Sequence, residues 1–130
     1  THCPDACPLA LQVMSDAIDG LGRLGERITP VFISVDPERD TPKVLKDYIE
    51  MFHPRMLAVT GGAQAIAEIA KRYRVTYAKA PGASEQSYAI DHSTAIYLTD
   101  AEGRVLGRFP HEIAPRALGG RIVEKMTQAQ

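Results

Sequence analysis

The stretch ITPVFISV, residues 28–35, is a run of apolar and β-branched residues with the length of a buried strand. Asp36 and Pro37 end it, and Thr41 and Pro42 then supply the N-cap and the first residue of a helix. The apolar face of that helix is formed by Val44, Leu45, Tyr48, Ile49 and Phe52. A buried strand followed by an amphipathic helix is the repeating unit of an α/β domain.

The same alternation continues on both sides of this stretch. The other predicted elements are a helix over 8–24, a strand over 56–60, a helix over 66–73, a short strand at 75–77, an irregular loop over 78–88, a hairpin within 93–109 and a helix over 113–126. This order predicts an α/β sheet flanked by helices on both faces, with an antiparallel edge from the hairpin. The whole chain, residues 1–130, is predicted to be a single domain.

The beginning of the chain leaves one element of this pattern unaccounted for. A helix that starts at Cys7 in such a fold should follow a buried strand, and no strand precedes Thr1 in the sequence. We therefore expect the parent protein to carry that strand upstream.

Composition excludes two classes of partner. The 15 basic residues are scattered among 16 acidic ones, and the formal net charge is −1. This balance argues against a nucleic-acid interface and against a patch for acidic membranes. No stretch approaches the roughly 20 apolar residues of a membrane-spanning helix.

The only two cysteines, Cys3 and Cys7, lie in the opening stretch THCPDACP, residues 1–8. Where the backbone is helical, positions four apart share a face, with their Cβ atoms about 5–6 Å apart. A helix N-terminus stabilises a thiolate and lowers its pKa. Because the thiolate is both the nucleophile and the metal ligand, the motif favours reactivity or coordination over packing.

Four uses of the pair remain open at this point. A structural disulfide would enclose a short loop and stabilise little, and two buried unreactive thiols do not suit the flanking His, Pro and Asp residues. Thioredoxin-type redox motifs favour two residues between the cysteines, whereas this pair is separated by three. Two thiolates can hold Cu(I), whereas Cu(II) or Zn(II) would need further ligands, most often imidazole.

Four histidines could supply that imidazole. His92 is the strongest candidate, because it lies where a polar loop meets a predicted strand, and such positions often display functional side chains. His2 adjoins the cysteines, whereas His53 and His111 are interpreted as ordinary boundary residues. A lone histidine is more often a solvated or hydrogen-bonded surface residue than a ligand.

Two acidic features accompany these residues. Asp91, next to His92, either orients the imidazole or caps the loop. The segment 36–40 follows the predicted strand over 28–35, on the expected side of the candidate site. It is either the rim of a docking surface or a turn followed by a helix cap.

Four stretches together resemble a known family. THCPDACP (1–8), FISVDPERDTP (32–42), TGG (60–62) and IDHSTAIYLTDAEG (90–103) occur in the order and at the intervals of the Sco/SenC family of copper-binding assembly factors for cytochrome c oxidase. The resemblance covers essentially the whole chain. Each motif alone is modest, but the four in register are highly specific.

The resemblance implies a thioredoxin-like, peroxiredoxin-like sheet flanked by helices, with its N-terminal strand or strands missing from this chain. It also implies one copper site. The cysteines of the family's Cys-x-x-x-Cys motif correspond to Cys3 and Cys7, and its ligand histidine corresponds to His92. The implied cargo is Cu(I) or Cu(II), which suits two soft thiolates and an imidazole.

The implied function is that of a metallochaperone for the binuclear copper centre of oxidase subunit II, with that copper domain and other copper chaperones as partners. The alternative is a thiol-disulfide oxidoreductase, in which Cys3 and Cys7 keep the oxidase cysteines reduced. A peroxidase ranks third, because no hydroxyl and guanidinium group accompany Cys3. Family members are typically anchored by an N-terminal helix, which this sequence does not contain, and face the bacterial periplasm or the mitochondrial intermembrane space.

Overall fold

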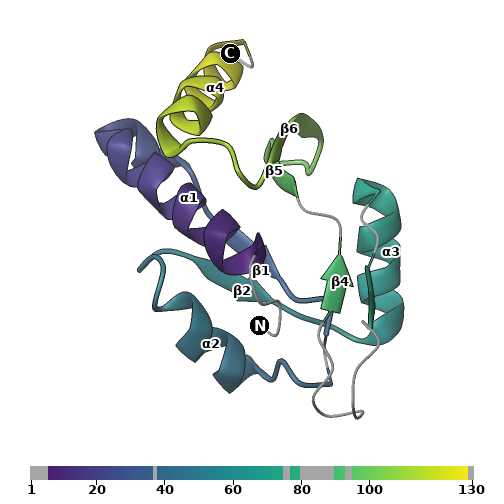
Figure 1. Cartoon of the computed structure of the whole chain (residues 1–130). Helices are drawn as coiled ribbons and strands as arrows, with labels where there is room; N and C mark the ends of the chain where they lie inside the picture. The colour runs from purple at the N-terminus through teal and green to yellow at the C-terminus, as the bar shows by residue number, and fades with distance from the viewer. Residues whose placement is uncertain (1–5, 37, 75–76, 80–89, 93–94, 129–130) are drawn as a thin grey trace.

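The computed structural model describes residues 6–36, 38–74, 77–79, 90–92 and 95–128, and for residues 6–7, 77–79 and 90–92 it describes the backbone alone. The elements are α1 (Ala6–Gly20), the 3-10 helix η1 (Gly22–Arg27), β1 (Val31–Ile33), α2 (Pro42–Ile49), β2 (Leu57–Val59), α3 (Ala63–Tyr73), β3 (Tyr77–Lys79), β4 (Ile90–His92), β5 (Ala95–Thr99), β6 (Val105–Pro110) and α4 (Pro115–Gln128) (Figure 1). From α1 to β3, helices and strands alternate as the sequence predicted. No helix in the described ranges is both long and apolar enough to cross a membrane.

Helix α1 lies between two layers of the fold (Figure 1). On one side, Leu11 packs with Ile49 of α2 and with Met56. On its other side, α1 packs against α4 and the β5–β6 hairpin, in a cluster formed by Val13, Ala17, Ile96, Phe109, Leu118 and Ile122. The helix is therefore held by its apolar residues on two faces.

The turn after α1 depends on a glycine. The predicted helix over 8–24 divides at Gly20, and η1 begins two residues later. A Cβ atom at Gly25 would collide with the carbonyl oxygen of Ile18, so the close return of η1 against α1 excludes a side chain there.

Strands β1 and β2 form a parallel pair, in which Phe32 lies opposite Ala58. The hydrogen bonds extend one residue beyond β1 at each end, because Leu57 N donates to Pro30 O and Ser34 N donates to Val59 O. The strand is shorter than the predicted run over 28–35, since its partner β2 spans three residues only.

The two faces of this pair differ. Phe32 and Ala58 pack toward α1 and α2. The opposite face carries Val31, Ile33, Leu57 and Val59, which are 38% to 54% exposed. This face is therefore less covered, among the described residues, than the face toward α1 and α2. Helix α3 reaches the β5–β6 hairpin through Tyr73, whose hydroxyl donates to Gly103 O at 3.0 Å.

The described strands form three separate pairs, β1–β2, β3–β4 and β5–β6. The antiparallel β5–β6 hairpin confirms the hairpin predicted within 93–109. The β3–β4 pair was not predicted. Ala78 and Lys79 were expected in a loop but pair with Asp91 and Ile90, because contact with a distant strand outweighs the weak strand propensity of this segment. Most of the predicted loop, and the predicted strand residues 75–76, lie outside the described residues.

Candidate metal centre

Cys7 is the second residue of α1 and so belongs to its first turn. The first N–H groups of a helix have no partner within it, and the helix dipole places partial positive charge there. Both effects stabilise a thiolate at this position. Cys3 lies outside the described residues, and the side chain of Cys7 is not described.

The packing of α1 shows which part of the fold lies level with Cys7. Leu11 and Phe32 belong to the same apolar cluster. Cys7 lies one helical turn before Leu11, which is about 6 Å along the helix axis. Ser34 lies two residues after Phe32, which is about 6 to 7 Å along the strand. Because β1 runs in the opposite direction to α1 (Figure 1), the first turn of α1 and the loop after β1 lie at the same end of the two elements.

That loop is held by a network of polar side chains, which we name the β1–α2 network: Ser34, Asp36, Arg39 and Asp40. The Ser34 hydroxyl donates to Asp40 Oδ2 at 2.5 Å and accepts from the Asp36 amide at 3.0 Å. Arg39 Nε donates to Asp36 Oδ2 at 2.6 Å. Asp36 and Asp40 are only 4% and 1% exposed. Their contacts match the turn-and-cap interpretation of the segment, whereas a docking rim would need these carboxylates at the surface.

The helix after this loop begins as the sequence predicted. Thr41 is the N-cap of α2, and its side chain accepts a hydrogen bond from Val44 N at 3.3 Å. Pro42 is the first helical residue, where its missing N–H has no cost.

His92 is the last residue of β4 and lies opposite Tyr77 of β3. Asp91 precedes it in the same strand, and the side chains of both residues are not described. No group of three potential metal-binding side chains occurs in the part of the chain where side chains are described, a part that excludes Cys3, Cys7 and His92. The meeting of these three residues stays a prediction.

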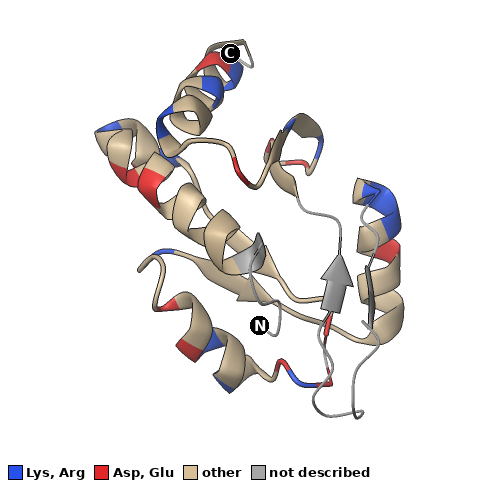
Figure 2. Ribbon diagram, in the orientation of Figure 1, with Lys and Arg blue, Asp and Glu red and all other residues tan. Residues whose placement is uncertain are grey.

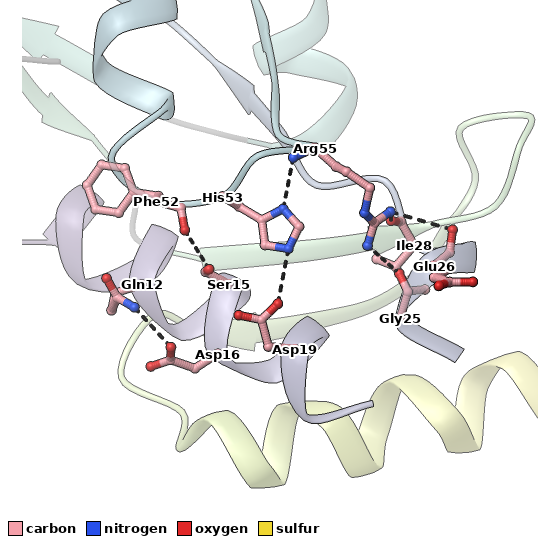
Figure 3. Close-up of polar contacts among 10 residues, drawn as sticks. All are labelled: Gln12, Ser15, Asp16, Asp19, Gly25, Glu26, Ile28, Phe52, His53 and Arg55. Atoms are coloured by element: carbon pink, nitrogen blue, oxygen red, sulfur yellow. Dashed lines mark hydrogen bonds and ion pairs between the residues drawn. The ribbon is translucent and has the colours of Figure 1, made fainter. Parts of the chain in front are cut away.

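Sequence reasoning missed the position of His53. It lies between α2 and β2, as predicted, but it is only 5% exposed and contacts a distant helix. His53 Nε2 lies 3.3 Å from Asp19 Oδ1 of α1, and His53 Nδ1 accepts from the Arg55 amide at 3.1 Å (Figure 3). The sequence carries no local signal for the first contact, because Asp19 lies on a separate helix.

Further contacts join the same turn to α1 and η1. The Ser15 hydroxyl donates to Phe52 O at 2.6 Å, and the Arg55 guanidinium donates to Gly25 O at 2.8 Å and to Ile28 O at 2.9 Å (Figure 3). We name Ser15, Asp19, Phe52, His53 and Arg55 the α2–β2 latch.

Acidic and basic residues are mixed on α2, α3 and α4, whereas the charged residues of α1 are acidic (Figure 2). Several lie in local pairs, such as Lys43 with Asp47 on α2 and Arg121 with Glu124 on α4. The sequence contains 15 basic and 16 acidic residues, and the expectation that the protein has no extended basic surface rests on this balance.

Comparison with known proteins gives a family model and relatives that all carry SCO names. The SCO1/SenC family model matches residues 1–127. An "SCO2-like protein" of Rickettsia felis is 40% identical over 119 residues, which are 91% of this chain and 58% of the relative. The "Protein SCO2 homolog, mitochondrial" of Bos taurus is 44% identical over 105 residues, covering 79% of this chain and 40% of the relative. The chain thus spans between 40% and 58% of the length of these two relatives.

Two solved structures with copper bound have the same fold. Arabidopsis thaliana ScoI superposes with a TM-score of 0.89 at 36% identity, over 98% of this chain and 79% of the other. Bradyrhizobium japonicum ScoI superposes with a TM-score of 0.84 at 35% identity, over 95% of this chain and 78% of the other. These likenesses confirm the predicted thioredoxin-like α/β fold. The family match extends over nearly all of the sequence, and the chain belongs to the SCO1/SenC family.

Proposed function

We propose that this chain is a copper-binding domain that delivers copper during cytochrome c oxidase assembly. The observation that carries the proposal is the Cys-x-x-x-Cys motif, which leads into the first turn of α1 in a chain of the SCO1/SenC family. The copper-bound state of the Arabidopsis thaliana relative supports the identity of the metal.

The proposed ligands are Cys3, Cys7 and His92. Two thiolates suit Cu(I), and an added imidazole suits Cu(II). The position of Cys7 at the start of α1 favours the deprotonated thiol that binds metal. Copper is the cargo of this protein, so the site must also release it to the thiols of a partner.

The proposed partners are the copper domain of oxidase subunit II and other copper chaperones. The mitochondrial name of the Bos taurus relative supports a place near the respiratory chain. We propose the same location for the parent protein. In a bacterium, we expect it to be anchored in the inner membrane with this domain facing the periplasm. In a eukaryote, we expect the domain to lie in the mitochondrial intermembrane space.

A second function rests on the same two cysteines. A thiol in the first turn of a helix, with a second four residues before it in the sequence, suits thiol-disulfide exchange in a thioredoxin-like fold. In this reaction the Cys3 and Cys7 thiolates reduce a disulfide of the partner to two thiols and become a disulfide themselves. The protein is then an oxidoreductase, and copper binding is not its purpose.

An assay with a purified oxidase copper domain separates the two functions. Copper-loaded protein is mixed with the reduced domain, and reduced metal-free protein is mixed with the oxidised domain. Copper transfer in the first mixture, without thiol transfer in the second, supports delivery. Thiol transfer alone would contradict it and favour the reductase. A Cys7→Ser variant should lose both reactions and serves as the control.

A further inference from the structure

His53 is a buried imidazole that the proposed copper site does not use. Both of its ring nitrogens face protein groups in the α2–β2 latch (Figure 3). Their partners are of opposite kinds, since the Arg55 amide is a donor and the Asp19 carboxylate is an acceptor.

The pair of partners determines where the ring hydrogen lies. A backbone N–H can only donate, so Nδ1 must accept the hydrogen bond of 3.1 Å from Arg55 N. The hydrogen of the ring then lies on Nε2, which faces Asp19 Oδ1 at 3.3 Å. The heavy-atom positions therefore select the Nε2–H tautomer.

The turn that supplies the Arg55 amide is itself fixed from two directions. The Arg55 guanidinium is bonded to Gly25 O and Ile28 O, and the preceding Phe52 O accepts the Ser15 hydroxyl. These contacts leave the Arg55 amide little freedom to turn away from Nδ1.

A histidine binds a metal ion through a nitrogen lone pair while its other nitrogen carries the hydrogen. In His53 the Nδ1 lone pair is occupied and the side chain is 5% exposed. Binding through Nε2 would move the ring hydrogen to Nδ1, directly against the Arg55 N–H. Neither nitrogen can therefore take a metal ion while the latch is intact.

We propose that the Arg55 amide locks His53 in the Nε2–H tautomer and occupies its only ring lone pair, and so prevents this imidazole from competing with the copper site. The statement about copper rests on the proposed function. The statement about the tautomer does not.

His111 provides an internal comparison. Its side chain is 16% exposed, its Nε2 lies 3.6 Å from Glu112 Oε1, and its Nδ1 is buried without a hydrogen-bond partner in the part of the chain that the structure describes. No described backbone amide fixes its tautomer. His111 should therefore respond to added metal before His53 does.

Long-range 1H–15N NMR of the metal-free chain near neutral pH tests the lock directly. We expect His53 to show Nε2 carrying hydrogen and Nδ1 without it, and to keep this pattern in both Asp19→Asn and Asp19→Ala. Asp19 is 71% exposed at its side chain, so these variants should fold. An Nδ1–H tautomer, a doubly protonated ring, or a switch of tautomer in Asp19→Ala would overturn the lock.

The consequence for metal is tested with Zn(II), a diamagnetic ion that binds imidazole. The chain used carries Cys3→Ser, Cys7→Ser and His92→Ala, so that the proposed ligands are absent. We expect the ring signals of His111 to shift first, with those of His53 unchanged at one equivalent. A shift of His53 at or before His111 would overturn the proposal. Failure of copper delivery would leave both results unaffected.

Discussion

Two polar networks brace the β1–α2–β2 unit at opposite ends, and they are built differently. The β1–α2 network joins residues separated by at most six positions, from Ser34 to Asp40. Apart from the local contact between His53 and Arg55, the contacts of the α2–β2 latch join residues 27 to 37 positions apart, such as Ser15 and Phe52. The first network shapes one loop, whereas the second fastens α1 and η1 to the turn before β2.

Because of this difference, the later turns of α1 and its first turn have different surroundings. The latch and the apolar clusters hold the later turns of the helix, at Ser15 and Asp19. The first turn, with Cys7, lies level with the loop that carries the short-range contacts of the β1–α2 network. The following predictions test this division.

The largest effect on stability is expected from Asp40→Ala. Asp40 is 1% exposed and accepts the Ser34 hydroxyl, so its removal leaves a buried hydroxyl without this acceptor and opens space. We expect the free energy of unfolding to fall by about 3 kcal/mol in urea titrations. Asp40→Asn keeps an acceptor oxygen and should lose less. A loss below about 1 kcal/mol for Asp40→Ala would contradict a stabilising role of the β1–α2 network.

Arg55→Ala removes the guanidinium that bonds to Gly25 O and Ile28 O. A hydrogen bond from a charged donor contributes about 1.5–3 kcal/mol at most, and solvent reduces this contribution at a partly exposed residue. We therefore expect the free energy of unfolding to fall by about 2 kcal/mol in total. Arg27→Ala, at an exposed residue of η1, is the control and should change little. Equal losses in the two variants would show that the latch adds no stability.

Ser15→Ala deletes a single hydrogen bond to Phe52 O and should cost about 1 kcal/mol. Combined with Arg55→Ala, it tests whether the latch acts as one unit. Because both side chains hold the same turn, we expect the double variant to lose less than the two single losses together, by roughly 0.5 kcal/mol or more. Strict additivity in urea unfolding would show two independent contacts.

The smallest effect is expected in the β5–β6 hairpin. The Arg104 backbone N–H bonds to Asp100 and lowers the pKa of this carboxyl, with further lowering by the Arg104 side chain and the Glu102 amide. The folded pKa lies below the unfolded value of about 3.9. The charged form therefore stabilises the hairpin above that pH, and the benefit is lost as the pH falls through the folded pKa.

Asp100→Asn should accordingly lower the Tm slightly at pH 7, and the difference from the original chain should shrink as the pH is reduced below about 4. Thermal unfolding followed by circular dichroism at both pH values measures it. A Tm difference that stays constant or grows on acidification would contradict the predicted direction of the pKa shift.

Local patterns explain what the sequence could predict. The N-cap at Thr41, the helix start at Pro42 and the hairpin turn near Gly103 depend on residues close together in the chain. Gly103 has a φ of 83°, which glycine adopts without strain. The family motifs around Cys3, Cys7 and His92 are likewise read directly from the sequence.

Long-range contacts explain what it could not predict. The strand residues Ala78 and Lys79 are set by pairing with β4, and His53 is buried by its contact with Asp19. Neither effect has a periodic or compositional signal within its own segment.

The central claim is a copper site made by Cys3, Cys7 and His92. A competition titration with a Cu(I) chelator, followed by the same measurement with Cu(II), tests it on the chain and on Cys3→Ala, Cys7→Ala and His92→Ala, with His53→Gln as the matched control. We predict one copper per chain, loss of Cu(I) binding in each cysteine variant, sharply weakened Cu(II) binding in His92→Ala and unchanged binding in His53→Gln. Full copper affinity in either cysteine variant, or intact Cu(II) binding in His92→Ala, would contradict the account.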